Sequence, residues 1–168
     1  MARSMPTSQA CDKVAEELGL NAFETPTGWK FFGNLLDAGL VTFCGEESFG
    51  TSSSHVREKD GLWAVLFWLN LLAATGLSVQ EILDRHWKRF GRHYYTRYDY
   101  EEIDKPAAES LMQQLETRLA ELAGTDQDGM RVATADNFSY VDPVDQSVSS
   151  GQGIRILFEN GPQAVDIP

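Results

Sequence analysis

The chain has 168 residues, 42% of them hydrophobic, and carries a formal net charge of −11. This length and apolar content predict one ordinary domain or two small ones with a packed core, and they exclude global disorder. The acidic balance argues against nucleic acid and anionic membrane as partners, because their phosphates would be repelled rather than neutralised.

The first half of the chain alternates helix and strand. Apolar residues at helical spacing predict helices over residues 8–18 and 29–38, and each is followed by a glycine that ends it. Short β-prone stretches predict strands over residues 20–25 and 40–44. This alternation indicates an α/β layer with parallel strands. The loop after residue 44 leaves the carboxyl end of a strand, where open α/β sheets bind ligands.

Two further helices are expected before residue 91. Residues 60–74 are apolar nearly all round, which is typical of a buried helix, and place Trp63, Phe67 and Trp68 in the core. After Gly76, Ser78 with Glu81 three residues later forms a capping-box pattern that begins the next helix.

The character of the sequence changes near residues 91–93, where we place a domain boundary. Residues 94–100 alternate like an exposed strand, and residues 104–123 predict a helix with leucines on one side. Short strands are expected over residues 130–133, 137–141 and 154–158. The second unit therefore reads as a small α+β domain.

Cysteine content and apolar runs indicate the cellular compartment in which the protein is expected. Cys11 and Cys44 are far apart and form no CxxC motif, which favours a reducing compartment. The first ten residues lack an apolar stretch of signal-peptide length, and the run from Leu62 to Thr75 is too short to span a bilayer. We therefore expect a cytoplasmic protein that is not embedded in a membrane.

The most informative stretch is FCGEESFG, residues 43–50. Carboxylates accept hydrogen bonds from sugar hydroxyls, serine can donate and accept, and glycines allow close approach of a ligand. Because adjacent side chains diverge, one of Glu46 and Glu47 is expected to face a ligand while the other makes structural contacts. Arg57 and Lys59 follow and supply cations for a phosphate. A sugar phosphate would satisfy both halves of this segment.

A plainer interpretation remains open, namely a solvated loop whose glutamates and lysine pair with one another. Other candidates are weaker. The serines at 52–54 beside His55 are more typical of a turn than of a catalytic triad, and no histidine spacing indicates a metal site.

Several blocks of sequence resemble phosphoglucomutase of the α-phosphohexomutase superfamily. They include TPTGWKFFGN (residues 25–34), CGEESFG (44–50), REKDG (57–61), TRYDYE (96–101), ADNF (135–138) and DPVD (142–145). The resemblance covers nearly the whole chain. It implies the later part of the third domain over residues 1–91 and the earlier part of the fourth over 92–168, with an α/β/α-layer fold followed by a partial α+β domain.

The resemblance also implies a function. Family members interconvert glucose 1-phosphate and glucose 6-phosphate through a phosphoserine and glucose 1,6-bisphosphate, with Mg2+. Carried over by position, Glu46 and Ser48 would bind the sugar, Thr27 would contact substrate, and Lys59 would hold a phosphate or sugar oxygen. Gly28 and Arg57 would add a backbone contact and charge support.

This sequence departs from the family pattern at three places. It has no phosphoserine loop resembling Thr-Ala-Ser-His-Asn-Pro, no Asp-x-Asp-x-Asp metal loop, and a poor match to the Arg-x-Ser-Gly-Thr phosphate clamp after Phe158. We therefore expect no catalytic residue and no metal ligand set in this chain, which would be inactive alone.

Three interpretations follow. The chain is a sugar-phosphate-binding portion of a phosphoglucomutase, a non-catalytic truncated descendant that acts as a binding or structural protein or has no function, or part of a mutase for another hexose phosphate. Strands missing from the third domain would leave a sheet edge uncovered, so self-association through that edge is expected.

Overall fold

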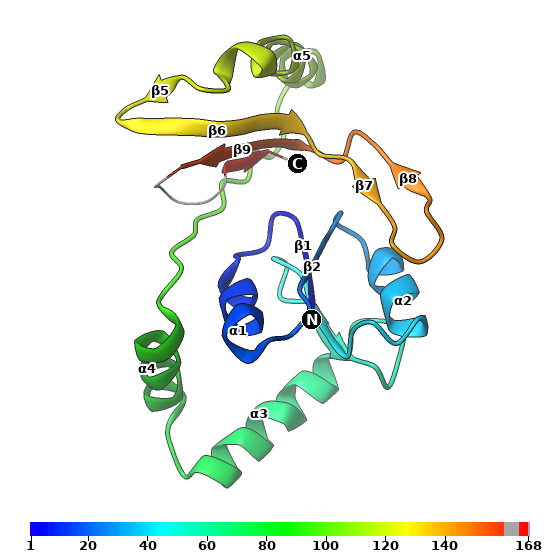
Figure 1. Cartoon of the computed structure of the whole chain (residues 1–168), viewed down its shortest axis with the longest axis vertical. Coiled ribbons are helices and arrows are strands. Elements are labelled where there is room, and N and C mark those ends of the chain that lie inside the picture. Colours follow the sequence, from blue (N-terminus) through cyan, green and yellow to red (C-terminus); the bar gives the residue numbers. More distant parts are fainter. Residues whose placement is uncertain (160–164, 168) are drawn as a thin grey trace. The chain divides into compact units, whose positions relative to one another are not determined.

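The computed structural model describes residues 1–159 and 165–167, which divide into two compact units (Figure 1). Unit 1 comprises residues 1–93 together with Asp142–Gln146, and unit 2 comprises Tyr94–Val141 and the residues from Ser147 onward. Each unit has its own sheet. The mixture of helices and sheets confirms the predicted α/β class.

Unit 1 is built on a four-stranded sheet in the order β2-β1-β3-β4. The central strand β1 (Ala2–Ser4) pairs in parallel with β2 (Phe23–Thr25) and with β3 (Phe43–Gly45), whereas β4 (Thr51–Ser53) is antiparallel to β3. The parallel strands were predicted, but β1 was not, because three residues are too few to show a period. The connecting helices are α1 (Ala10–Leu18) and α2 (Trp29–Asp37).

The core of unit 1 lies between α2 and the sheet. Phe32 and Leu35 are fully buried and pack with Ala2 of β1 and Cys44 of β3. Apolar residues at positions 29, 32, 35 and 36 lie on one side of α2, which is why this helix seals one face of the sheet.

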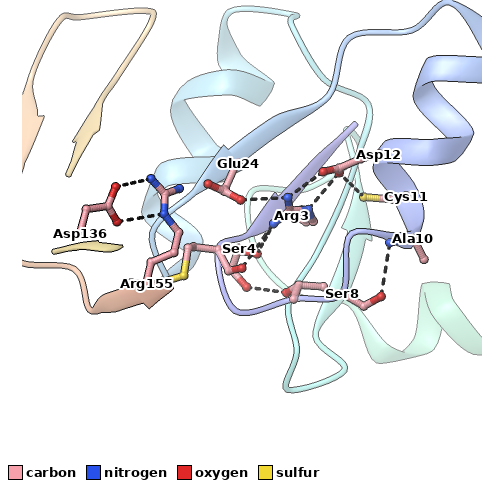
Figure 2. A network of polar contacts seen from close by, with 11 residues as sticks. Arg3, Ser4, Ser8, Ala10, Cys11, Asp12, Glu24, Asp136 and Arg155 are labelled. Carbon is pink, nitrogen blue, oxygen red and sulfur yellow. Dashed lines mark hydrogen bonds and ion pairs between the residues drawn. The ribbon is translucent and has the colours of Figure 1, made fainter. Parts of the chain in front are cut away.

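Arg3 is a buried cation of the central strand (Figure 2). Its guanidinium forms a bidentate pair with Asp12 of α1, at 2.9 and 2.7 Å, and also reaches Glu24 of β2 at 2.9 Å. Because a buried charge must be paired, these two carboxylates tie α1 and β2 to β1.

Helices α3 (Gly61–Thr75) and α4 (Val79–Phe90) complete unit 1. Asp60 caps α3 by accepting from the Trp63 backbone N–H at 2.9 Å, and the predicted capping box of Ser78 and Glu81 begins α4. The expectation that α3 is buried was wrong: it has no buried residue, and Phe67 and Trp68 are exposed. Among the described residues, none covers the side of α3 that carries Leu62, Val65, Leu66 and Leu69, which are between 50% and 70% exposed.

Unit 2 contains a four-stranded antiparallel sheet in the order β10-β9-β6-β5, a separate two-stranded sheet of β7 and β8, and one long helix packed on β6. Leu119 of the helix and Val132 of the sheet are buried at this contact. The elements are α5 (Lys105–Leu122), β5 (Asp126–Gln127), β6 (Met130–Asn137), β7 (Tyr140–Val141), β8 (Val148–Ser149), β9 (Ile154–Phe158) and β10 (Val165–Ile167).

The strand expected over residues 94–100 is wrong: the segment has no regular structure and its tyrosines are exposed, because it pairs with no strand of the described chain. The poor phosphate-clamp match concerns residues after Phe158, and of these 160–164 and 168 lie outside the described residues.

Within the described residues, no single helix is both long and apolar enough to cross a membrane. Only α3 and α4 taken together, with a bend of 84° between them, meet the requirement of length and composition.

Candidate functional site

The GEESFG segment is the tight loop of the β3–β4 hairpin. The Glu46 backbone N–H donates to the Gly50 carbonyl at 2.8 Å, and the Phe49 N–H donates to the Glu46 carbonyl at 3.1 Å. Phe49 takes a left-handed backbone conformation, with φ of 63°. These bonds hold the loop in one shape at the end of β3.

Glu46 connects its own loop to two other segments, the start of α2 at Gly28 and the residue Lys59 just before α3. Its side chain is only 2% exposed. One carboxylate oxygen, Oε1, accepts the Gly28 backbone N–H at 3.0 Å, and Oε2 pairs with Lys59 Nζ at 2.8 Å. Gly28 is the N-cap of α2 and has φ of 129°, a conformation that side chains disfavour. The predicted residues Gly28, Glu46 and Lys59 therefore form one cluster.

Lys59 reaches Glu46 by passing over Gly50. A Cβ at Gly50 would lie 2.8 Å from Lys59 Cδ, so a side chain there would displace the lysine. The hydrogen bond and the charge of Glu46 raise the pKa of Lys59, which keeps the ammonium protonated. The ammonium also lies 6.0 Å from the centre of the Trp29 ring. The result is a half-exposed cation held in a fixed place by a buried anion.

The remaining predicted residues divide into two groups. Thr27, which precedes Gly28, and Ser48, two residues after Glu46, are both exposed. Arg57 is not part of the cluster: its guanidinium binds Asp37 at the end of α2 and the Ser54 carbonyl. Charge near the loop therefore comes from Lys59 rather than from Arg57.

Both glutamates make contacts inside unit 1. Glu47 Oε2 accepts from Ser4 Oγ of β1 at 2.8 Å, which ties the loop to the central strand. The sequence predicted one structural glutamate and one facing a ligand. In the structure Glu46 is also engaged, although each of its oxygens accepts one bond and retains a further acceptor position.

Two features beside the cluster were not predicted from the sequence. Trp29 is 8% exposed, and its indole N–H finds no acceptor within the described residues. Asp60, adjacent to Lys59, is bound by His55 Nε2 at 2.8 Å, and His55 Nδ1 lies 2.9 Å from Ser53 Oγ. Trp29 was expected only as the first residue of a helix, and the partner of His55 is not visible from sequence spacing.

A magnesium site is not supported by the residues present. Across residues 1–159 and 165–167, no group of three or more His, Cys, Asp or Glu side chains is arranged to hold a metal ion.

Comparison with known families identifies the class of protein. Residues 1–90 match the family described as phosphoglucomutase/phosphomannomutase, alpha/beta/alpha domain III, and residues 92–166 match the phosphoglucomutase-1 C-terminal domain. The chain belongs to the phosphoglucomutase/phosphomannomutase family, which confirms the resemblance read from the sequence blocks.

Curated relatives are similar over almost the whole chain. A phosphoglucomutase of Rhizobium radiobacter is 64% identical over 98% of the chain, and a probable cytoplasmic phosphoglucomutase 2 of Arabidopsis thaliana is 54% identical over 98%. The chain spans only 30% and 31% of the length of these relatives.

Solved structures agree with this assignment. The open form of the exocytosis-sensitive phosphoprotein pp63/parafusin, a phosphoglucomutase of Paramecium, matches with a TM-score of 0.84 and 54% identity over 95% of the chain and 28% of its own. A putative phosphomannomutase of Thermus thermophilus matches with a TM-score of 0.63 at 21% identity, which supports the fold alone.

Proposed function

We propose that the cluster of Gly28, Glu46 and Lys59 is a sugar-phosphate half-site that binds glucose phosphates. The observation that carries the proposal is the position of the exposed Lys59 ammonium. It is held 2.8 Å from the buried carboxylate of Glu46, in the loop of residues 45–50. A lysine ammonium has three donors and Glu46 uses one, so the others can serve a phosphate or sugar oxygen.

Each predicted residue then has a distinct role. Ser48 and Thr27 supply exposed hydroxyls that can donate to and accept from a sugar hydroxyl. Glu46 chiefly holds Lys59 and the Gly28 turn in place, and its remaining acceptor positions can take a sugar hydroxyl. Arg57 can contribute only if it leaves Asp37, so we assign it a supporting electrostatic role.

The proposed function is a part of phosphoglucomutase chemistry. Relatives that bear the name phosphoglucomutase are about three times as long as this chain. In the complete protein the reaction would interconvert glucose 1-phosphate and glucose 6-phosphate through glucose 1,6-bisphosphate, and Mg2+ would be held by residues other than those described here. The chain would supply the sugar-binding loop, from a cytoplasmic location like that in the names of plant relatives.

The division into domains is part of the same proposal. We assign residues 1–91 to the third domain, which carries the half-site, and 92–168 to part of the fourth. The two family matches, over 1–90 and 92–166, support this assignment.

The test is calorimetric titration of glucose 1-phosphate into the 168-residue chain and its variants. We expect weak binding by the wild type, and a loss of about tenfold or more in Lys59→Met, because a charge-assisted contact to phosphate is removed. Glu46→Gln should also weaken binding, because it releases Lys59.

Lys88→Met is the matched control, since Lys88 is a lysine of α4 outside the cluster. It should bind like the wild type. The proposal fails if the wild type does not bind, or if both lysine variants lose affinity equally. A coupled assay for conversion of glucose 1-phosphate should show no turnover above background by the chain alone.

A further inference from the structure

Trp29 connects the core of unit 1 to the proposed half-site. It is the first residue of α2 and follows Gly28, whose N–H donates to Glu46. Its side chain is buried, and its ring meets the Phe32 ring edge to face, with 5.1 Å between the ring centres. The core therefore fixes this ring one residue away from a backbone group of the half-site.

Packing alone does not account for a tryptophan at this position. The indole N–H of Trp29 is buried and finds no acceptor among residues 1–159 and 165–167. A buried donor without a partner destabilises a fold. A phenylalanine would place an aromatic ring against Phe32 without this penalty.

The neighbour that does account for a tryptophan is Lys59. Its ammonium lies over the Trp29 ring, 6.0 Å from the ring centre. The face of an aromatic ring attracts a cation at distances up to about 6 Å, and tryptophan does so more strongly than tyrosine or phenylalanine. Because Glu46 Oε2 lies 2.8 Å from the same nitrogen, the ammonium has both an anion and an electron-rich ring as neighbours.

We propose that Trp29 is a positioning residue of the half-site, whose ring holds the Lys59 ammonium where it meets a phosphate or sugar oxygen. The inference rests on the proposed function of Lys59. A lysine side chain is long and flexible, and that of Lys59 is 47% exposed, so a single ion pair with Glu46 leaves it free to swing. A second contact restricts the side chain before the ligand arrives, which lowers the entropic cost of binding.

These contacts do not depend on what else surrounds the chain. Trp29, Glu46 and Lys59 all belong to unit 1. The described chain buries Trp29 by itself, leaving 8% of it exposed. A further part of a longer protein would therefore not replace Trp29 as the neighbour of the ammonium.

The test replaces Trp29 in the 168-residue chain by tryptophans that carry one, two or three ring fluorines. Fluorine withdraws electrons from the ring and weakens its attraction for a cation, while the shape of the side chain changes little. Calorimetric titration with glucose 1-phosphate should show an affinity that falls with each added fluorine, by about two- to fivefold over the series. A residue that only fills the core would show no such order.

Trp87 of α4 is the matched control. The Arg92 guanidinium carbon lies 4.3 Å from the centre of its ring, so Trp87 also has a cationic neighbour but lies outside the cluster. The same fluorines at Trp87 should leave the affinity for glucose 1-phosphate unchanged. Thermal melts would establish that all variants fold alike.

A second measurement needs no ligand. Carbon-13 relaxation of the Lys59 Cε group reports how firmly the side chain is held. We expect its order to decrease across the fluorine series at Trp29 and to stay constant across the series at Trp87. If the wild type does not bind glucose 1-phosphate, the proposed function fails, and this measurement decides the positioning role of Trp29 by itself.

Several results would overturn the inference. They are an unchanged order of the Lys59 side chain, an affinity that does not depend on fluorine at Trp29, and equal losses at Trp29 and Trp87. An affinity that rises with fluorine would overturn it as well. Fluorine makes the indole N–H a better donor, so a rise would indicate that this N–H bonds to the ligand in place of the ring holding Lys59.

Discussion

At the scale of residues, the main feature is a buried carboxylate that positions an exposed cation. Glu46 is almost fully buried, yet both of its oxygens are engaged, one by the Gly28 N–H and one by Lys59. Removing one partner of such a set leaves the other group unsatisfied. The arrangement explains why acids, glycines and a lysine occur together in this segment.

Gly50 is expected to be essential for the position of Lys59. In Gly50→Ala the new methyl would lie 2.8 Å from Lys59 Cδ, so the lysine must move away from Glu46. We expect a loss of about 1 kcal/mol in the free energy of unfolding and weaker binding of glucose 1-phosphate. Chemical denaturation and calorimetry would measure both.

Gly61→Ala is the control for this change. Gly61 begins α3, and a Cβ there meets no atom within 4 Å, so alanine should be neutral or slightly stabilising. Equal destabilisation by both alanine substitutions would show that the path of Lys59 over Gly50 is not the cause.

At the scale of elements, the N-terminus of α3 links the half-site to the rest of unit 1. Asp60 caps the helix through Trp63, and His55 holds the other oxygen of the same carboxylate. Lys59 immediately precedes this cap, so an ordered cap fixes the backbone that carries the cation.

This cap gives α3 a defined dependence on pH. The hydrogen bond from His55, followed by that from the Trp63 N–H, lowers the pKa of Asp60 from its ordinary value. A carboxylate with a lowered folded pKa stabilises the fold above its unfolded pKa, and this contribution is lost as the pH falls through the folded pKa. The difference in free energy of unfolding between wild type and Asp60→Asn should therefore be constant near neutral pH and shrink in the acid range, as the pH falls through the lowered pKa of Asp60.

Urea denaturation followed by tryptophan fluorescence at a series of pH values would measure this difference. A difference that stays unchanged down to about pH 2 would contradict the role of the ionised Asp60, because that pH lies well below the ordinary carboxyl pKa.

At the scale of the whole molecule, the features that could be predicted from the sequence are those that depend on local patterns of residues. The α/β class, α2, the capping box of α4 and α5 followed from periodicity and capping residues, and the family followed from sequence blocks. The half-site was predicted only as a set of candidate residues. A pair between a loop glutamate and the lysine was one of the interpretations left open, and Glu46 and Lys59 form it. That this glutamate is buried, and that Arg57 binds Asp37, depends on how the loop packs against α2, which no local pattern contains.

The errors have a common cause. Strand β1 is too short to show a period, and residues 94–100 have strand-like alternation but no pairing partner. The apolar composition of α3 predicted burial, but composition does not state which surface covers a helix. Each of these outcomes depends on contacts between distant segments.

The most direct test of the central claim is an amide chemical-shift titration of the isotopically labelled chain with glucose 1-phosphate, with inorganic phosphate in a parallel titration. We expect the largest shifts at Thr27, Gly28, residues 46–50 and Lys59 with the sugar phosphate, and a subset around Lys59 with phosphate alone. Saturating glucose 1-phosphate that leaves these amides unmoved, or moves only amides elsewhere, would contradict it.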